Sequence, residues 1–401
     1  MSSFPNTLPF AQAPFLSRRH FLRAAAAVGV SGAALGALHG PGLRNASAAD
    51  PLKGQIGAAL AGFVASGFPG VAVQVDQAGK TVYKGAAGLA SVEQESPLKV
   101  ADRHRIYSIA KAFTATVALQ LVDEGVLSLD DTVAQWLDDQ AVARIPNVDQ
   151  VTILQILNHT SGIYDFADDN DSSFWVDAFL GPDADPAKVW TLPELLAYAD
   201  GANHAPYFAP GEGYFYSNTN YILIGLIVEK ATGNAFGDEL RARVLNPLGL
   251  KETFFITGAE MPEGVVNPYQ LVEGQLLSVA QSNLSWAWTF GGMVSTLDDL
   301  ARFGEAMFSG ELLSAESFAE MFTWVPAGKP GKFEGLGVYK IGSQSGDLVG
   351  MDGTGPGANS SMMRLESADL TVFILTNLAG DDGGTDLLRD EIFRLVIEST
   401  N

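Results

Sequence analysis

The sequence contains no cysteine, so neither a disulfide bond nor a thiolate nucleophile or metal ligand can belong to this protein. Basic residues are also scarce: 24 lysines and arginines stand against 46 acidic residues, and the formal net charge of the 401 residues is −22. Nucleic acids and anionic membrane surfaces both require a basic face, so we expect no nucleic-acid partner. With 47% hydrophobic and 17% charged residues, the composition is that of a globular protein long enough for two domains or one large domain.

Motifs that depend on histidine or on clustered metal ligands are also missing. Beyond residue 48 there are three histidines, His104, His159 and His204, and neither His-Glu-x-x-His nor Gly-x-Ser-x-Gly occurs, so a zinc site and an α/β-hydrolase nucleophile elbow lack support. The acidic segment 165–171 lacks the glycine and distal glutamate of an EF-hand loop, so we expect a solvated loop rather than a calcium site. We expect His159 to be structural and His104, between two arginines, to lie at the surface. No metal or organic cofactor is expected.

The first 48 residues resemble a bacterial export signal. Arg18 and Arg19 form a twin-arginine pair, residues 24–38 are uncharged and apolar, and residues 46–48 are small enough for a signal peptidase. A retained membrane anchor or an ordinary helix are the alternatives, but the apolar stretch is short for a bilayer span. Cleavage removes four arginines and no acidic residue, which changes the net charge from −22 to −26. We expect a periplasmic or secreted protein without a membrane span in its mature part.

The order of the predicted elements favours an α/β fold. Strands are predicted at residues 71–75, 81–83, 361–365 and 370–375, and helices at residues 51–66, 106–122, 220–231, 297–307 and 386–397. Strand-like runs therefore lie near both ends of the mature chain, with helices and acidic loops between them. This order predicts an α/β domain formed by residues 49–125 and 288–401, and a mainly helical domain formed by residues 126–287.

Ser108 and Lys111 lie three residues apart at the start of the predicted helix 106–122. At this spacing the two side chains share one face of the helix. The helix N-terminus favours negative charge near the serine, and a desolvated lysine has a lowered pKa and can accept the serine proton. Ser-x-x-Lys alone is common by chance, so further motifs decide its meaning.

Tyr216 and Asn218 form a second motif, directly before the predicted helix 220–231. A phenol beside an ammonium group can relay a proton, and a carboxamide can orient a substrate amide. Taken alone, the segment is equally consistent with a turn that contains a half-buried tyrosine.

Together these motifs resemble the serine β-lactamase and penicillin-binding-protein superfamily. The resemblance is closest to its Tyr-x-Asn branch: class C β-lactamases, D-alanyl-D-alanine carboxypeptidases, D-aminopeptidases and related esterases. It extends over residues 55–395 and includes residues 107–114, 119–131, 154–162, 210–225 and 290–303. It implies a central antiparallel sheet flanked by helices, with a mainly helical insertion domain.

The resemblance also implies a role for each motif residue. Ser108 would be the acylated nucleophile and Lys111 its proton partner. Tyr216 would be the general base and acid, and Asn218 would bind the substrate carbonyl. The oxyanion hole would consist of the backbone N–H of Ser108 and that of Thr354 on the facing strand.

The third motif departs from the family pattern, in which Lys or His is followed by any residue and then Gly. The best match is Met351, Asp352 and Gly353, with Thr354 next, and these last three are predicted to bind substrate. The cation is missing at position 351, and the carboxylate of Asp352 would repel an anionic substrate. Residues 340–342 (Lys-Ile-Gly) fit the bare pattern but lie upstream of the glycine-rich turn, so we do not expect them to form this motif.

We interpret the sequence as an exported serine hydrolase that acts on small esters, D-residue peptides or amides through an acyl-enzyme on Ser108. The substrate would be a small molecule or short peptide. One alternative is a class C-type β-lactamase or a D-alanyl-D-alanine carboxypeptidase, which the missing cation disfavours. Another is a non-catalytic penicillin-binding-like module, which the presence of Ser108, Lys111, Tyr216 and Asn218 disfavours.

Overall fold

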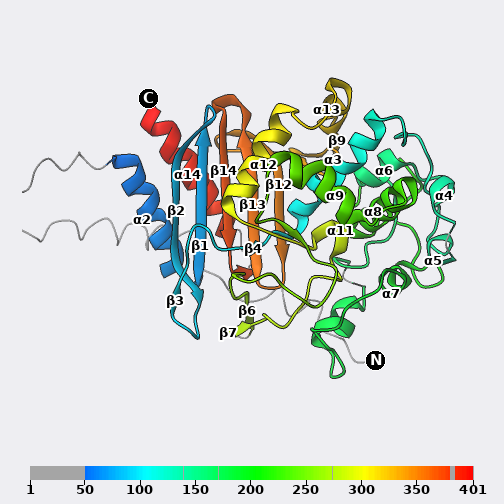
Figure 1. Ribbon diagram of the computed structural model, residues 1–401, viewed down its shortest axis with the longest axis horizontal. Coiled ribbons are helices and arrows are strands. Elements are labelled where there is room, and N and C mark those ends of the chain that lie inside the picture. Colours follow the sequence, from blue (N-terminus) through cyan, green and yellow to red (C-terminus); the bar gives the residue numbers. More distant parts are fainter. Residues whose placement is uncertain (1–49, 139, 170, 273, 380–383, 401) are drawn as a thin grey trace, which may run out of the picture.

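The computed structural model describes residues 50–400 except residues 139, 170, 273 and 380–383 (Figure 1). The predicted export signal lies outside the described residues. Within the described part of the chain, no helix is both long and apolar enough to cross a membrane.

A nine-stranded antiparallel sheet forms the centre of the molecule, with the strand order β3-β2-β1-β14-β13-β12-β11-β10-β9 (Figure 1). Its strands are β1 (Gly70–Gln77), β2 (Lys80–Ser91), β3 (Ser96–Pro97), β9 (Val325–Pro326), β10 (Lys332–Glu334), β11 (Tyr339–Ser343), β12 (Gly346–Gly355), β13 (Ala358–Leu365) and β14 (Leu370–Thr376). Because β1 pairs with β14, segments near the two ends of the described chain lie side by side in this sheet. The predicted α/β fold with a central antiparallel sheet is confirmed.

Helices cover both faces of the sheet. On one face lie α2 (Pro51–Ala65) and α14 (Gly384–Thr400), which contact each other. On the other lie α3 (Ala110–Asp123), preceded by the 3-10 helix η1 (Tyr107–Ile109), together with α8 (Asn218–Thr232), α11 (Trp288–Gly291) and α12 (Leu297–Ser309). The predicted strands and helices are all present, although the predicted helix 106–122 begins as a 3-10 turn.

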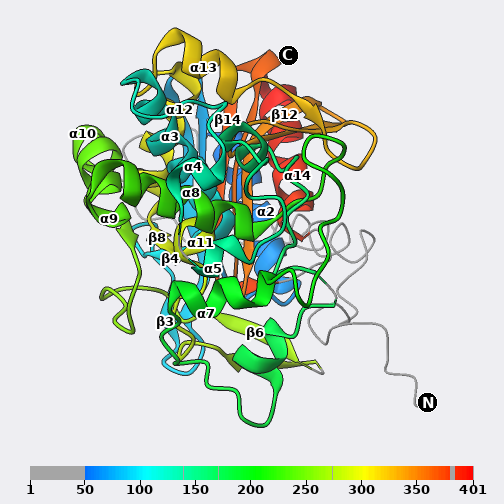
Figure 2. The same ribbon diagram turned by 90° about the vertical axis from the view of Figure 1, so that its right-hand side faces the viewer.

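Shorter elements complete the fold. The remaining helices are α4 (Val133–Trp136), α5 (Gln140–Ala143), α6 (Ile153–Leu157), η2 (Val176–Leu180), α7 (Leu192–Leu196), η3 (Ala197–Ala199), α9 (Phe236–Leu240), η4 (Arg241–Leu245), α10 (Asn246–Leu248), α13 (Ala315–Met321) and η5 (Glu366–Ala368). Two small sheets consist of β4 (His104–Arg105), β8 (Met293–Ser295) and β5 (Phe254–Phe255), and of β15 (Leu378–Ala379), β6 (Tyr269–Val272) and β7 (Gln275–Ser278). The second small sheet lies at the opposite end of the molecule from α13 (Figure 2). The division into two domains stays a prediction.

Alternation along the central strands separates two hydrophobic cores. Val71, Val73 and Val75 of β1 pack toward α2 and α14, whereas Ala72 belongs to the core shared with α3 and α8. This follows from the two-residue period of a strand. Since both faces are covered, all residues of β14 are buried.

One surface expectation is wrong: His104 is fully buried on β4, next to a buried Arg105. Its Nδ1 lies 3.3 Å from the carbonyl oxygen of Thr376, and burial lowers the pKa of His104 to about 4. Arg105 donates to the hydroxyl of Ser282 at 2.7 Å and to its carbonyl oxygen at 2.6 Å. The Arg-His-Arg pattern wrongly indicated an exposed segment, because the partners that bury His104 and Arg105 come from distant parts of the chain.

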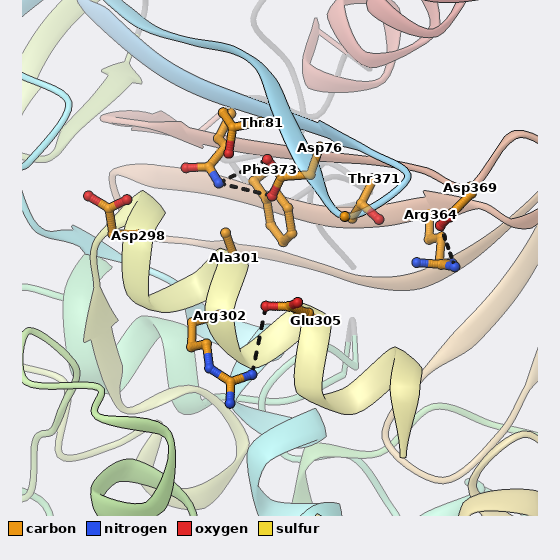
Figure 3. Close-up of a pocket in the computed structure, with 12 residues that line it drawn as sticks. Asp76, Thr81, Asp298, Ala301, Arg302, Glu305, Arg364, Asp369, Thr371 and Phe373 are labelled. Carbon is orange, nitrogen blue, oxygen red and sulfur yellow. Dashed lines mark hydrogen bonds and ion pairs between the residues drawn. The ribbon is translucent and has the colours of Figure 1, made fainter. Parts of the chain in front are cut away.

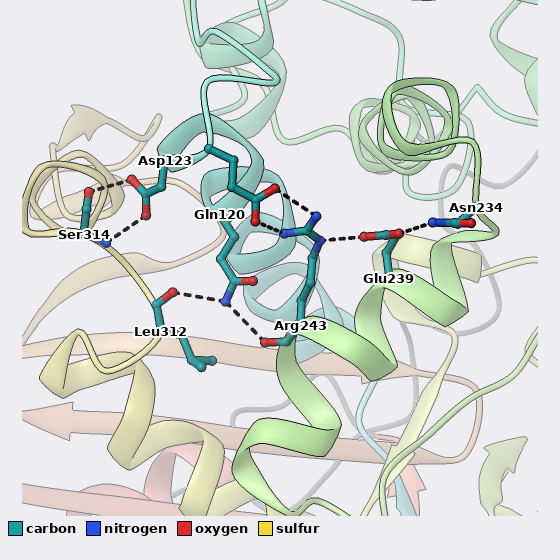
Figure 4. Close-up of polar contacts among 8 residues, drawn as sticks. Gln120, Asp123, Asn234, Glu239, Arg243, Leu312 and Ser314 are labelled. Carbon is teal, nitrogen blue, oxygen red and sulfur yellow. Dashed lines mark hydrogen bonds and ion pairs between the residues drawn. The ribbon is translucent and has the colours of Figure 1, made fainter.

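Polar contacts fix the C-terminal end of α3, the helix that follows Ser108 (Figure 4). Gln120 donates to the carbonyl oxygens of Leu312 and Arg243 at 3.1 and 3.3 Å. Asp123 accepts hydrogen bonds from the backbone N–H and hydroxyl of Ser314 at 2.8 and 2.5 Å. The guanidinium of Arg243 binds Glu124 at 2.5 Å, so η4, α3 and the segment before α13 are tied together. These contacts fix the end of α3 relative to η4 and to the segment between α12 and α13.

The N-terminal end of the same helix lies against β12. A Cβ atom at Gly353 would lie 2.1 Å from the carbonyl oxygen of Ile106, and one at Gly355 would lie 2.4 Å from the ring of Tyr107. Both distances are shorter than atoms can approach, so this crossing requires glycine. The crossing brings the third sequence motif to the predicted nucleophile.

We expect Gly353→Ala to lower the free energy of unfolding by about 1–3 kcal/mol, because the added methyl group must displace backbone. Gly342→Ala on β11 is the matched control, since the nearest atom to its Cβ is 3.8 Å away. Urea unfolding followed by circular dichroism measures both variants. Equal midpoints for Gly353→Ala and the parent protein would contradict the close crossing.

Candidate active site

Ser108 lies in η1 at the wall of a cavity of about 590 Å³. Tyr216, Asp352 and Thr354 line the same cavity. The residue before the serine, Tyr107, has a φ of 42°, a left-handed conformation that is strained for a large side chain. Its hydroxyl donates to the carbonyl oxygen of Pro356 at 2.5 Å, which ties the strained turn to the end of β12.

Three predicted catalytic groups meet at the serine oxygen. The amine of Lys111 lies 3.1 Å from Ser108 Oγ, and the hydroxyl of Tyr216 donates to the same oxygen at 3.0 Å. Lys111 Nζ also lies 2.7 Å from Asn218 Oδ1 and 3.1 Å from the carbonyl oxygen of Phe290. A neutral amine has two N–H groups, which these two acceptors use, so its lone pair is left to face the serine hydroxyl.

Burial sets the protonation of the two groups beside the serine. Lys111 is fully buried, and desolvation lowers its pKa to about 7 against the opposing effect of Asp168, Asp165 and Glu334. Desolvation also raises the pKa of Tyr216 well above 10, so the phenol stays protonated and acts as a donor. Near neutral pH, Lys111 is therefore the group able to accept the serine proton.

His159 holds the segment that contains Tyr216. Its Nδ1 accepts the backbone N–H of Ser217 at 3.1 Å, and its ring packs on the ring of Tyr216 with centroids 4.4 Å apart. Burial lowers the pKa of His159 well below 6.5, so the ring is neutral and Nδ1 remains an acceptor. His159 is a structural residue, as expected.

Asn218 is buried, and both polar atoms of its side chain form hydrogen bonds with other residues of the protein. Its Oδ1 faces Lys111, and its Nδ2 donates to Asp168 at 2.8 Å and to Asp165 at 3.3 Å. The expectation of a solvated loop at residues 165–171 is wrong for Asp165, which is 1% exposed and whose pKa burial and the neighbouring Asp168 raise to about 8. The contact of Asn218 with a substrate carbonyl stays a prediction, while its contact with Lys111 is observed.

In the third motif, residues 351–354 of β12, one edge of the strand faces the cavity with its backbone. β11 pairs with residues 346–350 of β12, and in the described part of the chain no strand pairs with the same edge of residues 351–355. This open edge includes Thr354, which lines the cavity together with Ser108. The arrangement suits the predicted second oxyanion donor.

The side chain of Asp352 is neutralised. It accepts a hydrogen bond from the hydroxyl of Tyr339, and it pairs with Arg389 of α14 at 3.0 Å. Arg389, which is 5% exposed, also pairs with Asp386 at 2.8 Å. Arg389 therefore reduces the predicted repulsion of anionic substrates by Asp352, although Asp386 shares its charge. Met351 lines the cavity as an uncharged, buried side chain.

Three charged residues on the cavity wall are not among the predicted site residues. Lys329, Lys332 and Glu334 all line it, and Lys332 and Glu334 are two residues apart on the short strand β10. Alternation places these two on one face of the strand, but three residues are too few to show a periodic signal. Lys340, by contrast, packs near the rings of Trp324 and Phe333 and is not part of this wall, as its position upstream of the glycine-rich turn indicated.

A second, smaller cavity of about 210 Å³ lies beneath α12, beside β1, β13 and β14 (Figure 3). Its charged groups pair with each other: Arg302 lies 3.8 Å from Glu305, and Arg364 lies 2.7 Å from Asp369. None of the predicted catalytic or substrate-binding residues lines it. The predicted site residues that line a cavity therefore lie at the one beside Ser108.

We expect the rate at which a fluorophosphonate labels Ser108 to rise with pH through about 7 and then to level off. The cause is Lys111, whose lowered pKa makes it a proton acceptor only above this value. Below the inflection the rate should change about tenfold per pH unit. Intact-mass measurement of the adduct over time gives this rate. A rate that does not vary between pH 5.5 and 8.5 would contradict the role of the buried amine.

Comparison with known proteins identifies the family to which this chain belongs. The model of the Beta-lactamase family matches residues 56–396. Penicillin-binding protein 4* of Bacillus subtilis is 27% identical over 76% of this chain and 67% of its own length. The next two curated relatives are matched over 55% and 56% of their length, so the chain spans about half to two thirds of them.

Solved structures with a similar fold include an amidase and an amidohydrolase. The D-amino acid amidase from Ochrobactrum anthropi SV3 superimposes with a TM-score of 0.77 and 28% identity, over 88% of this chain and 100% of that one. The D-stereospecific amidohydrolase from Streptomyces sp. superimposes with a TM-score of 0.74 and 31% identity, over 85% and 98%. The resemblance stated from the motifs is confirmed: the chain belongs to the β-lactamase family of serine hydrolases.

Proposed function

We propose that this protein hydrolyses small esters and amides, including D-amino acid amides and D-residue peptides, through an acyl-enzyme on Ser108. The observation that supports this most strongly is the meeting of Lys111 Nζ and Tyr216 OH at Ser108 Oγ, at 3.1 and 3.0 Å. The names of the similar proteins, among them D-aminopeptidase, esterase and D-amino acid amidase, favour this range of substrates.

In the first step Ser108 Oγ attacks the substrate carbonyl carbon while Lys111 takes the hydroxyl proton. The developing oxyanion is held by the backbone N–H groups of Ser108 and Thr354, each worth about 3–4 kcal/mol. Tyr216 then protonates the leaving alcohol or amine as the tetrahedral intermediate collapses. As the phenol gives up its proton, the ammonium of Lys111 passes its own proton to the Tyr216 oxygen, so that both groups return to their starting protonation states.

Deacylation repeats these steps with water. A water molecule attacks the ester carbonyl carbon of the acyl-enzyme and gives a proton to the Tyr216 oxygen, while the phenol passes its own proton to the neutral amine of Lys111. The resulting ammonium of Lys111 is the proton source for Ser108 Oγ. Ser108 Oγ leaves and is reprotonated, and the carboxylic acid is released. No metal is needed for this sequence, since proton transfer and oxyanion stabilisation are provided by the protein.

A second candidate is hydrolysis of β-lactams or of D-alanyl-D-alanine peptides, both of which have a carboxylate near the scissile bond. Lys329 and Lys332 favour it, because they supply positive charge to the cavity although Met351 replaces the family cation. The name of penicillin-binding protein 4* points the same way. Nitrocefin turnover measured beside ester and amide turnover decides between the two candidates.

We expect Ser108→Ala to lower turnover of p-nitrophenyl acetate and D-amino acid amides about 1000-fold or more, because it removes the nucleophile. Tyr216→Phe should lower it about 100-fold, the usual value of one proton-transfer group. Ser399→Ala, an exposed serine at the end of α14, is the matched control. A fluorophosphonate should add once, at Ser108. No adduct and no turnover in the parent protein would indicate a non-catalytic penicillin-binding-like module.

We also propose that the protein is exported through its twin-arginine pair, a proposal supported by the sequence of residues 1–48 alone. Replacing Arg18 and Arg19 by lysine should leave the uncleaved protein in the cytoplasm, because the pair is what the export receptor recognises. Arg44→Lys is the matched control. Cell fractionation and N-terminal sequencing of the exported form test this. Export of the double variant at the parental level would contradict it.

A further inference from the structure

Glu334 on β10 is a buried acidic residue that the proposed mechanism does not use. It is 1% exposed and lines the same cavity as Ser108. Its carboxylate accepts a hydrogen bond from the hydroxyl of Tyr214 at 2.8 Å. Among the described residues, no lysine, arginine or histidine nitrogen lies within 4.0 Å of it. The carboxyl group thus faces the cavity with no described cation in direct contact, although the charges of Lys332 and Lys111 act on it from farther away.

The fold places this carboxylate close to the reacting groups. Tyr214, its hydrogen-bond donor, is two residues from Tyr216 on the same segment. Three residues after Glu334, a Cβ at Gly337 would lie 2.7 Å from the carbonyl oxygen of Lys111, so the turn after β10 packs directly on α3. Glu334 is therefore part of the floor beside the nucleophile.

Burying a carboxylate without a cation in contact is unfavourable, and this cost favours the protonated form of Glu334. Burial raises the pKa of Glu334 to about 7, while Lys332, Tyr214 and Lys111 lower it less. Lys332 keeps its charge on the cavity wall, but its Nζ lies over the ring of Tyr339, 4.6 Å from the centroid, rather than in contact with Glu334. A ligand cation in the cavity would supply the missing partner.

We propose that Glu334 binds the ammonium group of the substrate and so selects substrates that contain a protonated amine, such as amino acid amides with a free amino group. This rests on the proposed function, because the site that Glu334 faces is the one at Ser108. Neither partner needs to be charged beforehand, since a proton passed from the acid to the amine gives the same ion pair. Asp168, the other acid near the serine, is exposed and already accepts from Asn218, so it discriminates less.

Binding to the Ser108→Ala protein tests the proposal without turnover. The ligands are D-phenylalaninamide and 3-phenylpropanamide, which differ by the amino group alone, and isothermal titration at pH 7 measures both. We expect the amine to bind at least tenfold more tightly. Adding Glu334→Gln should reduce this preference to less than twofold, because the amide has no charge.

Asp386→Asn is the matched control, an acid on the same wall that is paired with Arg389, and it should keep the tenfold preference. Glu334→Asp, which keeps the charge on a shorter side chain, serves if Glu334→Gln does not fold, and it should weaken the preference partly. A preference that survives Glu334→Gln, or an amine that binds no better than its neutral analogue when Glu334 is present, overturns the proposal. Absence of turnover and of a Ser108 adduct would instead overturn the proposed function.

Discussion

The burial of one amine is the constraint on which the rest of this structure depends. Lys111 has no exposed surface, and its Nζ contacts Ser108, Asn218 and Phe290, which come from three distant parts of the chain. The same contacts therefore join η1, α8 and α11 and orient the lone pair of the amine toward the serine. Burial lowers the pKa of Lys111 to about 7, which makes a structural residue into a usable base.

This pKa results from a balance between desolvation and nearby acids. Asp165, Asp168 and Glu334 would each favour the ammonium form, and desolvation exceeds their combined effect. The balance is possible because burial also raises the pKa values of Asp165 and Glu334, to about 8 and 7, so that near neutral pH Asp165 is mostly protonated and Glu334 is protonated in part. Lys111 can therefore be neutral near pH 7 although three acidic residues lie around it.

Local patterns were sufficient for most of the fold and for the catalytic group. Periodicity located the strands at residues 71–75 and 370–375, and helical spacing placed Ser108 and Lys111 on one face. That Tyr216 joins them was implied by the family resemblance. What sequence reasoning missed depends on contacts between distant segments. The pairing of Asp352 with Arg389 requires α14 to return to the sheet, and the contact of His104 with Thr376 requires β4 to lie against the end of β14. Neither contact has a periodic or motif signal in the sequence.

The third motif separates two tasks that a single strand performs in the family pattern. In β12 the backbone edge at Thr354 remains open to the cavity, while Met351 is uncharged and Asp352 is paired with Arg389. The charges that face a ligand come instead from β10, where Lys332 and Glu334 lie on the same face of the strand. Since β10 is separated from β12 by β11, the charge of the cavity can change there without moving the backbone donors. Substrate selection and oxyanion stabilisation are thus located on different strands.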